Sequence, residues 1–224
     1  MSRELVAFVP MRHESERVPG KNYRPLAGRP LFHHMVSTLL AVPEIDLVAI
    51  DTDSPTIAAD AADAFPGVLV LDRPAQLLGG DVPMNEILLH DVDVVEADLY
   101  LQTHSTNPLL RAATISAAIE GFRAAGDRHD SLFGVTPLHT RLWTADGRPL
   151  NHDPGVLLRT QDLPPVLEEN SCLYVFTAES LRRRGNRIGE RPLLFPIDRA
   201  EAWDIDDETD WLVAEALVTH ARQR

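Results

Sequence analysis

The sequence has little positive charge and almost no lysine. Its 224 residues contain 21 Lys and Arg against 34 Asp and Glu, so the formal net charge at pH 7 is -13. This balance argues against a broad basic face, and we expect no nucleic acid partner. Lys21 is the only lysine, and arginine supplies all the other Lys/Arg positions. Because an ammonium and a guanidinium are not interchangeable at a phosphate, position 21 is singled out for its chemistry.

Long apolar runs and cysteine pairs are also missing. No apolar stretch approaches the ~18 residues of a membrane span, and the N-terminus lacks a signal-peptide pattern. We therefore expect a soluble, cytoplasmic protein with no membrane partner. The single cysteine, Cys172, cannot form an internal disulfide, which fits a reducing compartment. It lies in "SCLYVF", which is typical of a buried strand, and this favours a structural thiol over a nucleophile.

Strand-length apolar runs alternate with helical patterns along the whole chain. "ELVAFVP", "LVAID", "VLVL", "DLYLQ" and "SLFGV" are the clearest strands. This alternation predicts an α/β fold: a three-layer, Rossmann-like, mostly parallel sheet with helices on both faces. The length fits a single domain over residues 1–224. Residues 137–165 are rich in proline and weakly periodic, so we expect them to protrude from the core.

A basic loop follows the first strand. Arg12, Arg17, Lys21 and Arg24 lie in it, and ligands of open α/β sheets bind beyond the carboxyl ends of the strands. Charge-assisted donors there suit a triphosphate, although a solvated edge would have the same composition. The loop has no G-K-[ST] sequence, which excludes a P-loop.

Acidic residues near the C-terminus form a second candidate site. Asp204 and Asp206 alternate at strand spacing, so we expect their carboxylates to point the same way and to hold Mg²⁺. The alternative is an acidic helix N-terminus, a role that Asp207 fits. Similar triplets at 51–53 and 91–93 weaken the pattern, and we expect Asp91 and Asp93 to lie on a helix surface.

Taken together, these segments resemble a known family. "VPMRHESERVPGKNYRPLAGRPL" is similar to the N-terminal signature R-x-G-S-K-R-x-P-x-K-N of the acylneuraminate cytidylyltransferases, also called CMP-sialic acid synthetases. "AIDTDSPTIAADA", "DRPAQLLGGD", "RTQDLPPVLEENSCLYVF" and "DIDDETDW" resemble further segments of that family in the same order. The resemblance implies a nucleotide-diphospho-sugar transferase fold. It also implies a CTP-dependent nucleotidyltransferase that activates a 2-keto-3-deoxy sugar acid, such as a sialic acid-like nonulosonic acid, and releases pyrophosphate.

The same resemblance implies roles for individual residues. Arg12 and Lys21 would contact the phosphates of CTP and, with Asp206, form the catalytic set. Gln102 would approach the acceptor sugar and Arg159 its carboxylate, and Mg²⁺ would be the cofactor, held by Asp204 and Asp206. The segment 137–165 would pair two subunits into a homodimer. The residues implied to bind the nucleotide are Arg12, Ser15, Lys21, Asn22, Arg73, Gly80 and Asp81.

Departures from the family pattern leave alternatives open. His13 and Glu14 stand where the family has Gly-Ser, and "QTHSTNPLLR" is longer than the family's Q-P-T-S-P-L-R. A related transferase acting on a phosphorylated sugar or a phosphonate is one alternative. A glycosyltransferase using Asp51 and Asp53 is another, and a non-catalytic nucleotide-binding protein is a third. His104 is a candidate general base or, alternatively, a hydrogen-bonding loop residue.

Overall fold

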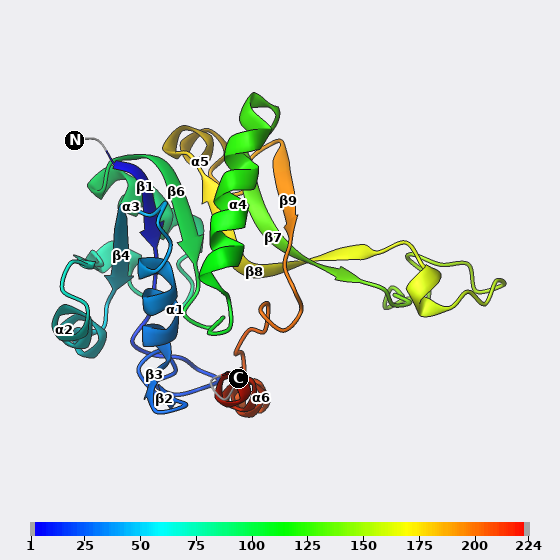
Figure 1. Ribbon diagram of the computed structural model, residues 1–224, viewed down its shortest axis with the longest axis horizontal. Helices are drawn as coiled ribbons and strands as arrows, with labels where there is room; N and C mark the ends of the chain where they lie inside the picture. The colour runs from blue at the N-terminus through cyan, green and yellow to red at the C-terminus, as the bar shows by residue number, and fades with distance from the viewer. Residues whose placement is uncertain (1–2, 222–224) are drawn as a thin grey trace.

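The fold is built on one seven-stranded sheet, seen in a computed structural model that describes residues 3–221 (Figure 1). The strand order is β5-β4-β1-β6-β8-β7-β9. All neighbouring strands pair in parallel except β8, which is antiparallel to β6 and β7. The predicted mostly parallel sheet is therefore confirmed. Its strands are β1 (Arg3–Phe8), β4 (Leu47–Thr52), β5 (Leu69–Asp72), β6 (Ala97–Thr103), β7 (Ser131–Leu138), β8 (Val166–Phe176) and β9 (Pro192–Pro196).

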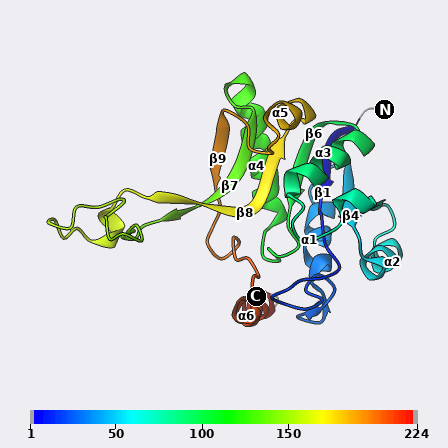
Figure 2. The ribbon, with the colours of Figure 1, turned by 180° about the vertical axis from the view of Figure 1, so that it is seen from behind.

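Helices cover both faces of the sheet, which completes the predicted three layers (Figures 1 and 2). Apolar side chains of α1 (Leu31–Leu40), α2 (Pro55–Ala64) and α4 (Ala112–Ala125) pack in the core of one face. Those of α3 (Met84–Val94) and α5 (Ala178–Arg184) pack in the core of the other. Ser54 followed by Pro55 is a typical start of a helix in sequence, and helix α2 begins there, with Ser54 Oγ accepting a hydrogen bond from Ile57 N at 3.2 Å. The short 3-10 turns are Ala75–Leu77, Gly126–Arg128 and Thr160–Asp162.

The last helix supports the basic loop. Helix α6 (Glu208–Ala221) packs beside the small hairpin of β2 (Pro25–Leu26) and β3 (Arg29–Pro30). Trp211 is buried against the apolar residues of this loop, and the Arg24 guanidinium lies 4.3 Å from its ring centroid. Asp207 accepts hydrogen bonds from the first backbone N–H groups of α6, as its predicted capping role requires. The C-terminal helix thus fixes a loop near the N-terminus.

The segment between β7 and β8 leaves the body of the molecule, as predicted. The two strands extend outward as a ribbon, paired as far as Leu138 and Val166, and the chain between them forms the protrusion seen in Figures 1 and 2. Several of its apolar side chains are open to solvent, and Leu157 is 91% exposed. None of the helices described over residues 3–221 is both long and apolar enough to cross a membrane.

Two local predictions were wrong. Asp204 and Asp206 lie in irregular chain before α6, not in a strand, because this stretch pairs with no neighbouring strand. Asp91 is fully buried, whereas Asp93 is exposed. Asp91 follows Ile87 by one helical turn and therefore shares the face of α3 that packs on the sheet.

Cys172 is buried as expected, and burial raises the pKa of its thiol.

Candidate active site

The basic loop leaves the carboxyl end of β1 and is fixed to β4. Met11 N donates to the Asp51 carbonyl at 2.8 Å, which sets the start of the loop. Arg12 then reaches across to the loop after β5, where its Nη1 donates to the Gly80 carbonyl at 3.0 Å. Asn22 Nδ2 closes the loop by donating to the Arg12 carbonyl at 2.8 Å. Arg12, Asn22 and Gly80 are therefore neighbours, and all three belong to the set that the family resemblance implies for nucleotide binding. Ser15 lies half-buried in the same loop, and the exposed Asp81 follows Gly80.

The lone lysine reaches the acidic segment. Lys21 Nζ donates to the Ile205 carbonyl at 2.6 Å, between the two aspartates of the D-I-D sequence. Burial lowers the pKa of Lys21, although the carboxylates of Asp204 and Asp206 act in the opposite direction. An ammonium at the end of a flexible stem fits this confined place, whereas a planar guanidinium would need more room. The two predicted sites, cationic and acidic, thus form one site.

Asp204 and Asp206 have the chemistry of a magnesium site. Burial raises the pKa of Asp204, and its Oδ1 accepts no hydrogen bond from the described residues. Asp206 pairs with Arg17 at 2.7 Å. No group of three or more His, Cys, Asp or Glu within residues 3–221 forms a metal cage. Two carboxylates can hold a Mg²⁺ ion that draws its remaining oxygen ligands from phosphates and water, and this assignment stays a prediction.

Arg73 lies beneath the loop, in a buried charge network that the sequence patterns did not indicate. It is 4% exposed, pairs with the buried Asp51, and donates from Nη2 to the Met11 carbonyl at 3.3 Å. Asp91 lies beside Asp51, and burial together with the Asp51 charge raises the pKa of Asp91 to about 9. Arg73 thus holds the start of the basic loop, and its contact with cytidine stays a prediction. The signal that was missed is the helical spacing of Asp91 from Ile87.

The carboxyl end of β6 carries a second polar cluster. Gln102 is fully buried, and its Nε2 donates to the Thr103 carbonyl at 2.8 Å and lies 3.1 Å from His104 Nε2. Its Oε1 accepts a hydrogen bond from Arg187 Nη1 at 2.6 Å. The Arg187 guanidinium stacks 3.6 Å from the ring centroid of Tyr174 on β8. Arg187 was not predicted, since it lies 85 residues from Gln102 in no recognisable motif.

His104 is poorly suited to act as a base. Burial, together with the charges of Arg187 and Lys21, lowers the pKa of His104 to about 3. General bases work best when their pKa lies near the working pH. The lowered pKa and the contact with Gln102 Nε2 therefore favour the hydrogen-bonding role for His104.

Arg159 lies apart from the other predicted residues. It is on the protrusion, where its exposed guanidinium forms a two-pronged ion pair with Asp162, with Nε 2.6 Å from Oδ2 and Nη2 3.0 Å from Oδ1. Within one chain, the structure does not bring it to Gln102 or to the aspartates. Its contact with an acceptor carboxylate stays a prediction.

A hollow of about 420 Å³ adjoins the acidic segment. Asp204 and Asp206 line it together with Glu169 and Ser171 of β8. The Tyr174 hydroxyl donates to Glu169, so the Arg187–Tyr174 stack is linked by hydrogen bonding to the wall of this hollow. The space offers an acceptor a place beside the candidate metal ligands.

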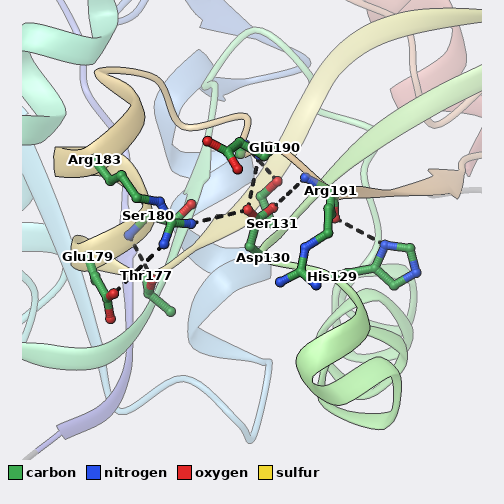
Figure 3. Close-up of polar contacts among 10 residues, drawn as sticks. His129, Asp130, Ser131, Thr177, Glu179, Ser180, Arg183, Glu190 and Arg191 are labelled. Carbon is green, nitrogen blue, oxygen red and sulfur yellow. Dashed lines mark hydrogen bonds and ion pairs between the residues drawn. The ribbon is translucent and has the colours of Figure 1, made fainter.

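A larger hollow of about 530 Å³ lies at the opposite end of the sheet, near the start of β7. There Asp130 accepts hydrogen bonds from the backbone N–H groups of Glu190 and Arg191 and pairs with Arg183 at 3.4 Å (Figure 3). His129 contacts the Arg191 carbonyl, and Arg123 pairs with Glu4. These contacts attach the chain entering β9 to β7, and we assign them a structural role.

Comparisons with known proteins identify the family of the chain. A family model described as "Cytidylyltransferase" matches residues 6–202. The chain is 28% identical to a CMP-N,N'-diacetyllegionaminic acid synthase of Legionella pneumophila, covering 96% of each chain. It is 24% identical to a post-translational flagellin modification protein B of Campylobacter coli, covering 96% of this chain and 95% of that protein.

Two solved structures share the fold. One is CMP:2-keto-3-deoxy-manno-octonic acid synthetase in complex with CTP, with a TM-score of 0.71, 17% identity, and coverage of 97% of this chain and 99% of the other. The other is 4-diphosphocytidyl-2C-methyl-D-erythritol synthase, with a TM-score of 0.70, 18% identity, and coverage of 97% and 100%. The fold alone therefore does not select the acceptor. On the family match and the geometry of the site, the chain belongs to the cytidylyltransferase family of CTP-dependent nucleotidyltransferases.

Proposed function

We propose that the protein transfers CMP from CTP to the anomeric hydroxyl of a 2-keto-3-deoxy sugar acid of the nonulosonic type. The observation that carries this proposal is the convergence of Lys21 with Asp204 and Asp206 beside the Arg12 loop. The relatives named for CMP-legionaminic acid synthesis and flagellin modification support a sugar acid rather than a phosphorylated acceptor.

In the proposed reaction, the charged groups of the site act on the phosphates of CTP. The acceptor hydroxyl attacks the α-phosphorus of CTP, the bond to the pyrophosphate oxygen breaks, and the hydroxyl proton passes to solvent. Arg12 and Lys21 stabilise the charge that develops on the leaving pyrophosphate, and Ser15 and Asn22 orient the phosphates. Asp204 and Asp206 would hold Mg²⁺, which when bound neutralises phosphate charge. Positioning and electrostatics supply most of the rate, as in other transfers of this kind.

The proposal includes a homodimer formed through the protrusion. Leu157, Leu150 and Val156 are 91%, 62% and 53% exposed there, and exposed apolar side chains gathered on one segment are typical of an interface. A second subunit would also bring Arg159 of one protrusion toward the site of its neighbour. A cytoplasmic location stays a prediction.

Release of pyrophosphate by the purified protein tests the proposed function. The protein is incubated with Mg²⁺, each of the four nucleoside triphosphates in turn, and an acceptor panel of nonulosonic acids, 2-keto-3-deoxyoctonate, sugar phosphates and phosphonates. We expect release with CTP and a sugar acid only. Release that requires a phosphorylated acceptor would contradict the acceptor class. An inactive protein that still binds CTP would support a non-catalytic role.

A further inference from the structure

Arg187 is a half-buried cation at the acceptor side of the site. Two of its contacts fix its plane: the stack on Tyr174 and the hydrogen bond to Gln102. Its backbone N–H donates to the side chain of Asn85 at the start of α3, which holds the loop after α5 in place. The guanidinium is therefore oriented before any ligand binds.

Arg187 forms no close ion pair with an acid. None of the ion pairs formed within residues 3–221 includes Arg187, although the Tyr174 side chain and the Glu169 carboxylate both act on its charge. Burial lowers the pKa of Arg187, whereas Tyr174 and Glu169 act in the opposite direction, and the guanidinium stays protonated at neutral pH. A partly desolvated charge is costly, and a ligand that supplies an opposite charge at hydrogen-bond distance would relieve that cost.

We propose that Arg187 binds the carboxylate of the acceptor sugar acid and thereby determines acceptor specificity. This inference rests on the proposed function and adds a residue to it. A guanidinium can donate two parallel hydrogen bonds to a planar carboxylate. Gln102, which accepts from Arg187, lies at the end of β6, and Ser105 just beyond it donates from Oγ to Asn22 Oδ1 of the basic loop at 2.6 Å, so a carboxylate bound here lies near that loop.

The surrounding charges favour a carboxylate over a phosphate. Glu168, Glu169, Asp204 and Asp206 line the neighbouring hollow, and Glu169 accepts the Tyr174 hydrogen bond next to Arg187. The acidic wall repels any anion, and it disfavours a doubly charged phosphate more than a monoanionic carboxylate that pairs with the guanidinium. Arg159, the earlier candidate, already has a carboxylate partner in Asp162.

The test compares a sugar acid with its neutral methyl ester. In the wild type we expect kcat/KM to be at least about 30-fold higher for the acid, a factor typical of leaving a desolvated charge unpaired. Arg187→Gln is expected to remove most of this preference and to raise the KM for the acid while leaving the KM for CTP unchanged. Arg187→Lys is expected to restore part of the preference. Arg184→Gln, an exposed arginine in α5, is the matched control and is expected to behave as wild type.

Two outcomes would overturn the proposal. One is an Arg187→Gln protein that folds and binds CTP normally and still prefers the acid. The other is loss of the preference in Arg159→Gln alone, which would place the carboxylate on a protrusion. Calorimetric titration of sialic acid and its methyl ester onto the protein with a non-hydrolysable CTP analogue gives a readout without turnover. A wild type that shows no preference there contradicts the role of Arg187, whereas preference without pyrophosphate release contradicts only the proposed reaction.

Discussion

At the scale of single residues, Lys21 joins the two halves of the site. Its ammonium contacts the carbonyl between Asp204 and Asp206, at the end of a loop that also carries Arg12. We expect Lys21→Ala to lower kcat by about 10²–10³-fold, the range found when one preorganised electrostatic donor is removed. Lys21→Arg is expected to lose nearly as much, because the larger planar group does not fit the same place. Rates of pyrophosphate release measure both effects, and full activity of Lys21→Arg would contradict this role.

The metal assignment is tested at Asp206. Asp206→Asn keeps the size of the side chain but removes one anionic ligand, so we expect a higher Mg²⁺ concentration for half-maximal rate and a kcat lower by about 10-fold or more. Asp207→Asn, which keeps an acceptor for the first turn of α6, is the matched control. An Asp206→Asn protein with an unaltered Mg²⁺ dependence would place the metal elsewhere.

Asp91 makes the stability of the fold depend on pH. Its pKa is raised from 3.8 to about 9, so between these values the folded protein holds a proton that the unfolded chain releases. The contribution of Asp91 to stability is therefore fully present below pH 3.8 and is lost as the pH rises toward 9. We expect Asp91→Asn to flatten this dependence and to raise the free energy of unfolding at pH 8 by about 1–3 kcal/mol. Urea unfolding at several pH values measures it, and an equal loss of stability at all pH values would contradict it.

Sequence reasoning reached some of these residues and missed others. Lys21, Arg12 and the D-I-D carboxylates were found because their composition is unusual within short segments. Arg187 was missed because its importance depends on Gln102 and Tyr174, which only the folded sheet brings to it. Asp91 was misplaced because its acidic character was given more weight than its helical spacing from Ile87.

At the scale of elements, the strands and helices were largely predictable and their directions less so. Alternating apolar runs located the central strands, and Ser54 with Pro55 located the start of α2. The antiparallel direction of β8 follows from the long excursion that turns the chain back along β7, which periodicity does not reveal. The same excursion, which forms the protrusion, carries the highly exposed Leu157.

The protrusion is predicted to hold two subunits together. We expect Leu157→Asp to weaken self-association by at least about 10-fold, since a charge replaces an apolar side chain at the interface. Leu212→Asp on α6, where Leu212 is 68% exposed, is the matched control. Sedimentation velocity at several concentrations measures the oligomeric state. A wild type that is monomeric at all concentrations, or a Leu157→Asp protein that dimerises as wild type does, would contradict this role.

At the scale of the whole molecule, the sheet gathers its chemistry at one end. The carboxyl ends of β1 and β6 and the segment before α6 bring the basic loop, Gln102 and the acidic carboxylates together. The opposite end holds polar groups that are already paired with each other. The net charge of -13 also leaves the cations of the site as local exceptions, which fits small anionic substrates better than an extended polyanion.

Phosphorus-31 NMR of the products formed from CTP, Mg²⁺ and a nonulosonic acid tests the proposed reaction most directly. We expect a single phosphodiester resonance, that of a CMP-sugar, together with free pyrophosphate. Two coupled resonances of a bridging diphosphate, formed only with a phosphorylated acceptor, would contradict the proposed acceptor.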